Sequence, residues 1–256
     1  DWSSDVCSSD LFDSIPYTEN DTPEHNRINE KISEKTLVLL KNEGGLLPLN
    51  KNNMKTIGVI GPNANSRAAL VGNYEGTASR YVTVLEGIQD YVGDDVRVMY
   101  SEGCALFKDR VCVLSEPNDR LAEVKGVCEA SDVVIVCLGL DATLEGEEGD
   151  TGNEFASGDK PDLNYPGLQN EILKAAYESG SAMDLSWADE HIPAIVQAWY
   201  PGSRGGEAVA RLLFGECSPE GKLPVTFYRS VEELPEFTDY SMKGRTYRYM
   251  EQEALY

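Results

Sequence analysis

The sequence is short of positive charge. Its 22 lysine and arginine residues stand against 44 aspartate and glutamate residues, which leaves a formal net charge of -22. A field of this sign repels the phosphate backbone of nucleic acids and the headgroups of anionic lipids. We therefore expect no nucleic-acid partner and no membrane partner, whereas a neutral ligand such as a sugar is not repelled.

Long apolar runs are absent as well. No stretch approaches the roughly 20 apolar residues that a membrane-spanning helix needs. No segment has the basic and then apolar arrangement of a signal peptide, so the cytoplasm is the favoured compartment. The hydrophobic residues, 41% of 256 positions, are instead sufficient for the core of an ordinary globular chain.

Motifs for metals, cofactors and activated nucleophiles are also missing. The six cysteines form no C-x-x-C pair and only His25 and His191 could join them, so we expect neither a metal nor a cofactor. The G-x-G-x-x-G motif of dinucleotide-binding proteins does not occur. The G-x-S-x-G motif of serine hydrolases is absent too, which argues against that class of enzyme.

The N-terminal stretch differs from everything that follows it. Its first eleven residues, DWSSDVCSSDL, mix serine, aspartate and cysteine without hydrophobic periodicity, as is typical of a cloning or sequencing scar. We expect residues 1–22 to be a scar and a linker outside the fold.

From Thr22 onward, helical patterns alternate with short apolar runs. Thr22 is expected to cap a first helix that continues through Leu39 and Leu40 to a glycine pair at 44–45. Further helices are expected over 83–93, 118–132, 165–180 and 205–215, and strands over 55–62, 95–103, 132–140, 192–202 and 222–228. This alternation predicts the doubly wound α/β class, with a mostly parallel sheet and helices on both faces.

One place breaks the alternation. Two helix-like stretches, 166–179 and 182–190, follow each other with almost nothing between them. Parallel sheets normally return to a strand between such helices. Either one interior strand is missing near Gly180, or the second stretch is only a turn that leads into the next strand.

The segment LEGEEGD, residues 144–150, places four carboxylates directly after an apolar run. It belongs to a long connection, from Asp141 to Tyr165, at a strand end of the kind where α/β sheets bind ligands. Composition alone favours a solvated acidic loop. The alternative is that one carboxylate is a general acid whose pKa is raised by negative neighbours and by partial desolvation.

A second polar segment, GNYEGTASRYVT, gathers amide, aromatic and charged side chains at Asn73, Tyr74 and Arg80. This mixture suits a sugar, whose hydroxyl groups take hydrogen bonds and whose ring stacks on aromatic side chains. It suits a plain surface loop equally well.

Seven motifs occur in one order along the chain: LVLLKNEGGLLPL, IGVIGPNA, GNYEGTASRYVTVLEGI, GLDATLEGEEGD, DLNYPGLQNEIL, QAWYPGSRGGEAVARLLFG and GKLPVTFY. Together they resemble the C-terminal α/β sandwich domain of glycoside hydrolase family 3. The ending DYSMKGRTYRY is similar to the β-glucosidase and β-xylosidase branch. The resemblance implies a flavodoxin-like α/β sandwich over 23–229. It also implies that a strand has been lost over 179–181. Residues 230–256 are rich in charge and tyrosine, and from this composition we expect an arm or a linker towards an absent domain.

The resemblance also implies a function, that of a retaining exo-acting β-glycosidase. Such enzymes remove a terminal β-linked xylose or glucose from an oligosaccharide or glycoside with two carboxylates. The nucleophile of the family lies on an N-terminal (β/α)8 barrel, which takes roughly 250 residues and cannot fit before Thr22. We therefore expect the barrel to be an absent partner and this chain alone to be inactive.

The acid/base of the family comes from the loop that the acidic segment matches. Glu145 is the first candidate, with Glu147 and Glu148 as alternatives. The resemblance places Asn73, Tyr74 and Arg80 near the substrate or the missing barrel. The rival interpretation is a non-catalytic carbohydrate-binding or assembly module.

Overall fold

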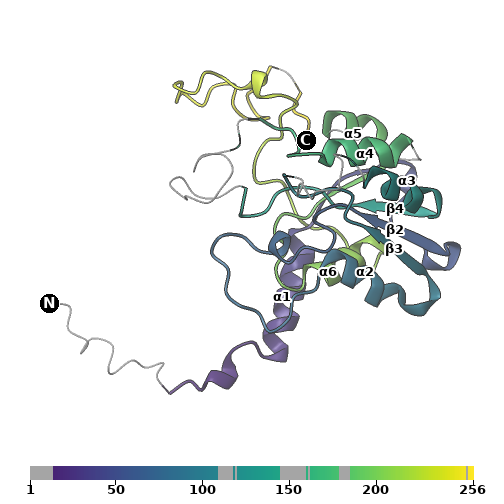
Figure 1. Ribbon diagram of the computed structural model, residues 1–256. Coiled ribbons are helices and arrows are strands. Elements are labelled where there is room, and N and C mark those ends of the chain that lie inside the picture. Colours follow the sequence, from purple (N-terminus) through teal and green to yellow (C-terminus); the bar gives the residue numbers. More distant parts are fainter. Residues whose placement is uncertain are drawn as a thin grey trace.

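The chain folds into two β-ladders with helices packed around them (Figure 1). The computed structural model describes residues 14–108, 118, 120–144, 160, 162–178, 185–251 and 253–256. Its strands are β1 (Val38–Asn42), β2 (Thr56–Ile60), β3 (Arg97–Ser101), β4 (Val133–Val136) and β5 (Ala194–Gln197). Its α-helices are α1 (Pro23–Thr36), α2 (Val84–Val92), α3 (Leu121–Glu129), α4 (Gln169–Glu178), α5 (Leu185–His191) and α6 (Gly205–Leu213). None of these helices is long and apolar enough to cross a membrane.

A parallel ladder in the order β3-β2-β4 forms the centre of the fold. Ile57 of the middle strand lies opposite Val98 of β3 and Val133 of β4. Ile57 and Val59 are buried in the cluster that contains residues of α2 and α6, whereas Ile60 is buried in the cluster of α3 and α4. Helices therefore cover both faces of the ladder, which confirms the predicted α/β class.

The second ladder corrects the prediction of a first helix that continues through Leu39 and Leu40. The helix α1 does begin after Thr22, whose hydroxyl accepts the backbone N–H of His25 at 3.2 Å, but it ends at Thr36. The next residues form β1, which pairs antiparallel with β5. The apolar run LVLL, in which Leu37 is completely buried, fits a helix or a strand by its pattern alone, and pairing with β5 decides for the strand.

Helix α1 is not held by an apolar stripe. Ile28 and Ile32, which the helical pattern singles out, are 45% and 57% exposed. Arg211 of α6 reaches across instead, with its Nη1 2.6 Å from Glu30 and 2.7 Å from Glu34. Contact between α1 and α6 thus relies on ion pairs as well as on packing.

The predicted strand over 222–228 is wrong. Pro224 lacks an N–H for a ladder, and within the described ranges the backbone of Phe227 bonds with the C-terminal residues and not with a strand. The Leu255 N–H donates to the Phe227 carbonyl at 2.9 Å, and the Phe227 N–H donates to the Tyr256 carbonyl at 3.2 Å. The chain after Phe227 therefore leaves the body and returns to it, as the yellow segment of Figure 1 shows.

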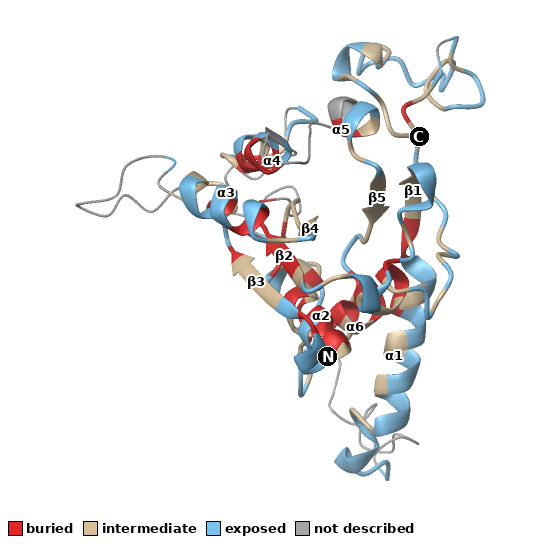
Figure 2. Cartoon of the chain, turned by 90° about the vertical axis from the view of Figure 1, so that its right-hand side faces the viewer, coloured by how far each residue is buried: buried red, intermediate tan, exposed pale blue. Residues whose placement is uncertain are grey.

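The two ladders are not joined by strand pairing anywhere in the described part of the chain. Figure 2 shows β1 and β5 standing apart from β3, β2 and β4. Residues 179–184, around the expected missing strand, lie outside the described residues, so that strand stays a prediction. The stretch that follows is helix α5 and not a turn. Every residue of β4 and β5 is only half-buried, although both strands are almost wholly apolar.

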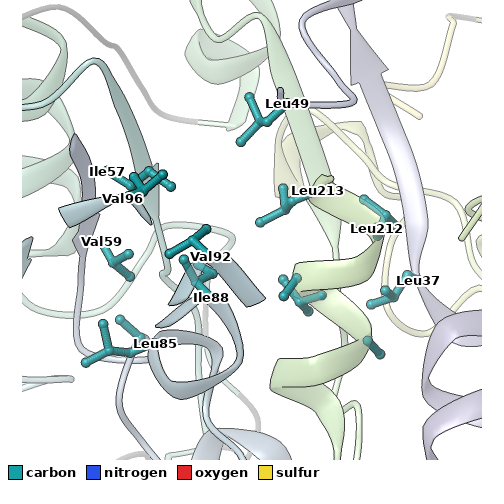
Figure 3. Packing of buried hydrophobic residues seen from close by; sticks show 14 residues of the cluster. Leu37, Leu49, Ile57, Val59, Leu85, Ile88, Val92, Val96, Leu212 and Leu213 are labelled. Atoms are coloured by element: carbon teal, nitrogen blue, oxygen red, sulfur yellow. The ribbon is translucent and has the colours of Figure 1, made fainter. Parts of the chain in front are cut away.

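Helices α2 and α6 connect the two halves by crossing at glycines. A Cβ at Gly87 would overlap the carbonyl oxygen of Gly206, and a Cβ at Gly206 would overlap the carbonyl oxygen of Thr83. Around this crossing, Leu85 and Ile88 of α2 share one buried cluster with residues of α6 and of β2 (Figure 3). Because both positions are glycines, α2 and α6 can approach closely, and this fixes the distance between the parallel ladder on one side and α6 with β1 and β5 on the other.

This crossing predicts opposite effects for two glycine substitutions. Gly87→Ala should lower the free energy of unfolding by about 1 to 3 kcal/mol, because the new methyl group forces the helices apart. Gly126→Ala is the matched control in α3, where nothing lies within 4 Å of the added Cβ. It should raise stability by roughly 0.5 to 1 kcal/mol through helix propensity alone. Urea unfolding followed by circular dichroism measures both, and equal effects would contradict the proposed close contact.

Among the described residues, one edge of β4 and one edge of β5 have no strand partner, which predicts a weakly stable product. Exposed apolar strand edges template pairing with other molecules, and the margin of a typical domain is only about 5 to 15 kcal/mol. We expect the purified chain to have a low thermal unfolding temperature or to aggregate on heating. Circular dichroism measures the first outcome and light scattering the second. A cooperative thermal transition well above room temperature would show that the sheet closes without a further strand.

Candidate functional site

A polar pocket of about 660 Å³ lies at the carboxyl edge of the parallel ladder. It is lined by Pro62, Asn65, Ser66, Arg67, Thr83, Glu86, Tyr100, Glu102, Leu106 and Asp141. These residues come from the chain that follows β2, from the first turn of α2, from the end of β3 and from the chain that leaves β4. Ligands of α/β sheets bind at this edge, so the pocket is the candidate site.

The wall formed by α2 is rigid because its polar groups bind one another. Glu86 donates its backbone N–H to the Thr83 hydroxyl at 3.2 Å, and its carboxylate accepts the Thr83 N–H at 2.9 Å. This reciprocal capping box leaves the Thr83 hydroxyl proton for Asn65, whose Oδ1 accepts it at 3.0 Å. The chain after β2 is thereby tied to the start of α2.

The wall formed by β3 presents a hydroxyl and a paired carboxylate. Glu102 lies 2.5 Å from Nη1 of Arg120, which offsets its negative charge. Burial, with the nearby carboxylate of Glu102, raises the pKa of Tyr100. A tyrosine hydroxyl is protonated at neutral pH in any case, so that of Tyr100 can both donate and accept a hydrogen bond, as sugar hydroxyl groups require.

The chain that leaves β4 turns at the buried residue Asp141. The side chain of Asp141 is 6% exposed, and its Oδ1 accepts the Thr143 N–H at 2.9 Å and the Thr143 hydroxyl at 2.5 Å. The Leu144 N–H donates to the Asp141 carbonyl at 3.0 Å, and Leu144 itself is 4% exposed. The acidic segment therefore begins from an anchored residue at the pocket wall.

The predicted site residues fall into two groups. Glu145, Glu147 and Glu148 lie outside the described residues, so their roles stay predictions. Asn73, Tyr74 and Arg80 do not line the pocket. Tyr74 is 85% exposed, and Arg80 places Nη2 3.4 Å from the Asp90 carboxylate of α2, on the surface.

The loop of these three residues is nevertheless ordered from within. The Tyr81 hydroxyl accepts the Ala78 N–H at 3.2 Å and donates to the Gly76 carbonyl at 3.3 Å. A further bond joins the Ser79 N–H to the Asp21 carboxylate at 3.0 Å. These bonds fix the course of the loop between Gly76 and Tyr81.

Sequence reasoning missed most of the pocket lining. A signal existed for Asp141, since Asp-x-Thr after a strand is typical of a turn in which the carboxylate binds the backbone two residues later. No local signal brings Asn65, Tyr100 and Glu102 together, because they come from separate connections. Across the ranges described, no three His, Cys, Asp or Glu side chains gather as a metal site.

The Asp141 turn predicts a graded pair of substitutions. Asp141→Ala removes the acceptor of two hydrogen bonds, from the Thr143 N–H and the Thr143 hydroxyl, and should lower the free energy of unfolding by about 1 to 3 kcal/mol. Asp141→Asn keeps an oxygen acceptor and should cost less. Asp94→Ala, at an exposed acidic position, should change stability by no more than about 0.5 kcal/mol. Denaturant unfolding and hydrogen exchange at the Thr143 amide test the order, and unchanged exchange in Asp141→Ala would contradict it.

Comparisons with known proteins agree with this architecture. The sequence pattern of the Glycosyl hydrolase family 3 C-terminal domain matches residues 37–256. A β-xylosidase from Formosa agariphila is 31% identical, in an alignment that covers 96% of this chain and 36% of the relative. The chain thus spans about a third of the length of that relative.

Solved structures give the same result. A β-glucosidase from Erythrobacter marinus matches with a TM-score of 0.74 and 31% identity, over 92% of this chain and 34% of that one. An exo-β-xylosidase of the family, in complex with a xylobiose aziridine probe, matches with a TM-score of 0.73 and 26% identity, over 91% of this chain and 30% of that one. The family match over residues 37–256, together with the parallel ladder and its helices, shows that the chain belongs to glycoside hydrolase family 3, of which it contains the C-terminal domain.

Proposed function

We propose that this chain supplies the general acid/base of a retaining exo-acting β-glycosidase, which removes a terminal β-linked xylose or glucose. The observation that carries the proposal is the turn from Asp141 to Leu144, whose two end residues are buried and anchor the start of the acidic segment beside a polar pocket. The names of the relatives, a β-xylosidase and a β-glucosidase, support this substrate class.

The proposed chemistry divides between two parts of a longer protein. A retaining glycosidase needs a protonated carboxyl at the leaving oxygen and an ionised carboxylate roughly 5 Å from it. Glu145, which directly follows the anchored Leu144, is the proposed acid/base. The nucleophile would come from a (β/α)8 barrel, consistent with a chain that spans about a third of its relative. This chain alone is therefore predicted to be inactive.

The pocket and the neighbouring surface loop have proposed roles in binding. The hydroxyl of Tyr100 and the amide of Asn65 suit the hydroxyl groups of a neutral sugar. Tyr74, 85% exposed, is suited to stack on a sugar ring or to pack against the barrel. Asn73 and Arg80 lie on the same exposed loop and are proposed to act with it.

A second candidate function is carbohydrate binding without catalysis. The observation that favours it is the set of exposed aromatic side chains on the C-terminal arm. Phe237, Tyr240, Tyr247 and Tyr249 are 85%, 81%, 64% and 68% exposed. Exposed aromatic rings of this kind stack on sugars, and this role needs no barrel.

Leaving-group dependence tests the assignment of Glu145. In the polypeptide that joins this domain to its barrel, Glu145→Gln should slow the hydrolysis of aryl glycosides with poor leaving groups by about 10²–10⁴-fold. Glycosides with good leaving groups depart without protonation, so their cleavage should be affected far less. Steady-state kcat/KM for both substrates measures the difference.

Glu147→Gln and Glu148→Gln are the matched controls, because they remove one carboxylate from the same segment. An equal or larger selective loss in either control would show that Glu145 is not the acid/base. Hydrolysis by this chain alone would contradict the need for a barrel. Glycan binding without turnover in the joined polypeptide would favour the second function.

A further inference from the structure

The side chain of Gln169, the first residue of α4, is completely buried. A carboxamide loses its hydration when it is buried, which is costly unless its polar atoms find partners inside the protein. The pattern of neighbouring residues does not require a polar group at this position, since Ile172 and Leu173 on the same helix are buried apolar side chains. The location of its partners shows why a glutamine is suitable there.

The Gln169 carboxamide joins two loops at the carboxyl edge of the sheet. Its Oε1 accepts the Gly139 N–H at 2.8 Å, and its Nε2 donates to the Gly139 carbonyl at 2.8 Å. The second hydrogen of Nε2 goes to the Leu106 carbonyl, also at 2.8 Å. Gly139 lies just after β4 and Leu106 follows β3, and Leu106 also lines the pocket.

The two bonds to Gly139 resemble those that a neighbouring strand would make, because they take both backbone groups of one residue. Gly139 has a φ of 146°, a backbone conformation that residues other than glycine rarely adopt. The bonds therefore hold the chain in an unusual direction as it leaves the sheet. Asn63 continues the restraint, since its Nδ2 donates to the Leu140 carbonyl at 3.2 Å. The Asp141 turn comes next.

We propose that Gln169 is a positioning residue for the acid/base step, a role that rests on the proposed function. It sets the direction in which the chain leaves β4, and this direction determines where the acidic segment begins relative to the pocket. Holding the two loops in this way requires a side chain that both donates and accepts hydrogen bonds. An ionised glutamate cannot donate to the carbonyl groups of Gly139 and Leu106, and leucine can neither donate nor accept.

The test compares two kinds of substrate in the polypeptide that joins this domain to its barrel. Gln169→Leu and Gln169→Glu should lower kcat for a poor leaving group at least tenfold more than for a good one, because the acid is misplaced while the nucleophile is not. The second variant keeps the size of the side chain and serves if the first does not fold. Ile172→Val, a buried change on the same helix, is the matched control for lost stability and should affect both substrates equally.

The outcomes separate the two proposals. A selective loss in Glu145→Gln, together with equal losses for both substrates in the Gln169 variants, overturns the positioning role alone. Variants of Glu145, Glu147 and Glu148 that all lack leaving-group dependence overturn the proposed function and this role with it. Selective losses in both Glu145→Gln and the Gln169 variants support the positioning role.

Discussion

The close approach of α2 and α6 is the contact on which the rest of the structure depends. Neither Gly87 nor Gly206 can carry a side chain there without overlapping a backbone carbonyl. Helix α2 packs with the parallel ladder, while α6 follows β5 and packs against α1. Because no strand pairing joins the ladders within the described ranges, this crossing and the shared core around it hold the two halves together.

The same crossing fixes one wall of the pocket. Gly206 donates its N–H to the Val82 carbonyl at 2.9 Å, and Val82 donates its own N–H to the Ser203 carbonyl at 2.8 Å. These bonds hold the residue before Thr83, whose hydroxyl and backbone organise the capping box and Asn65. Packing between the halves and geometry at the site are therefore linked through one short stretch of backbone, so a change at the crossing also reaches the pocket.

Elements that are determined by nearby residues could be predicted from the sequence, whereas elements that are determined by distant contacts could not. The helix over 83–93 and the strand over 55–62 depend on local pattern, and both were predicted, as α2 and β2 confirm. The run from Leu37 to Leu40 is too short to separate a helix from a strand, and its pairing with the distant β5 decided for the strand. The partnership of Gln169 with Gly139 spans thirty residues and leaves no local trace, because a buried carboxamide has the same letter as an exposed one.

The support for the acidic segment comes from elements other than the strand that is expected to be missing. Beyond the end of β4, the chain is held by Gln169 on α4, by Asn63 after β2 and by the buried Asp141. None of these bonds needs a strand beside β4. A lost strand therefore weakens the packing of β4 and β5, where half-buried apolar residues remain, more than it disturbs the lead-in to the site. A catalytic group must be held to within about 0.5 Å, and a buried side chain such as Gln169, whose carboxamide oxygen and both N–H groups have partners, can hold the chain this closely without a further strand.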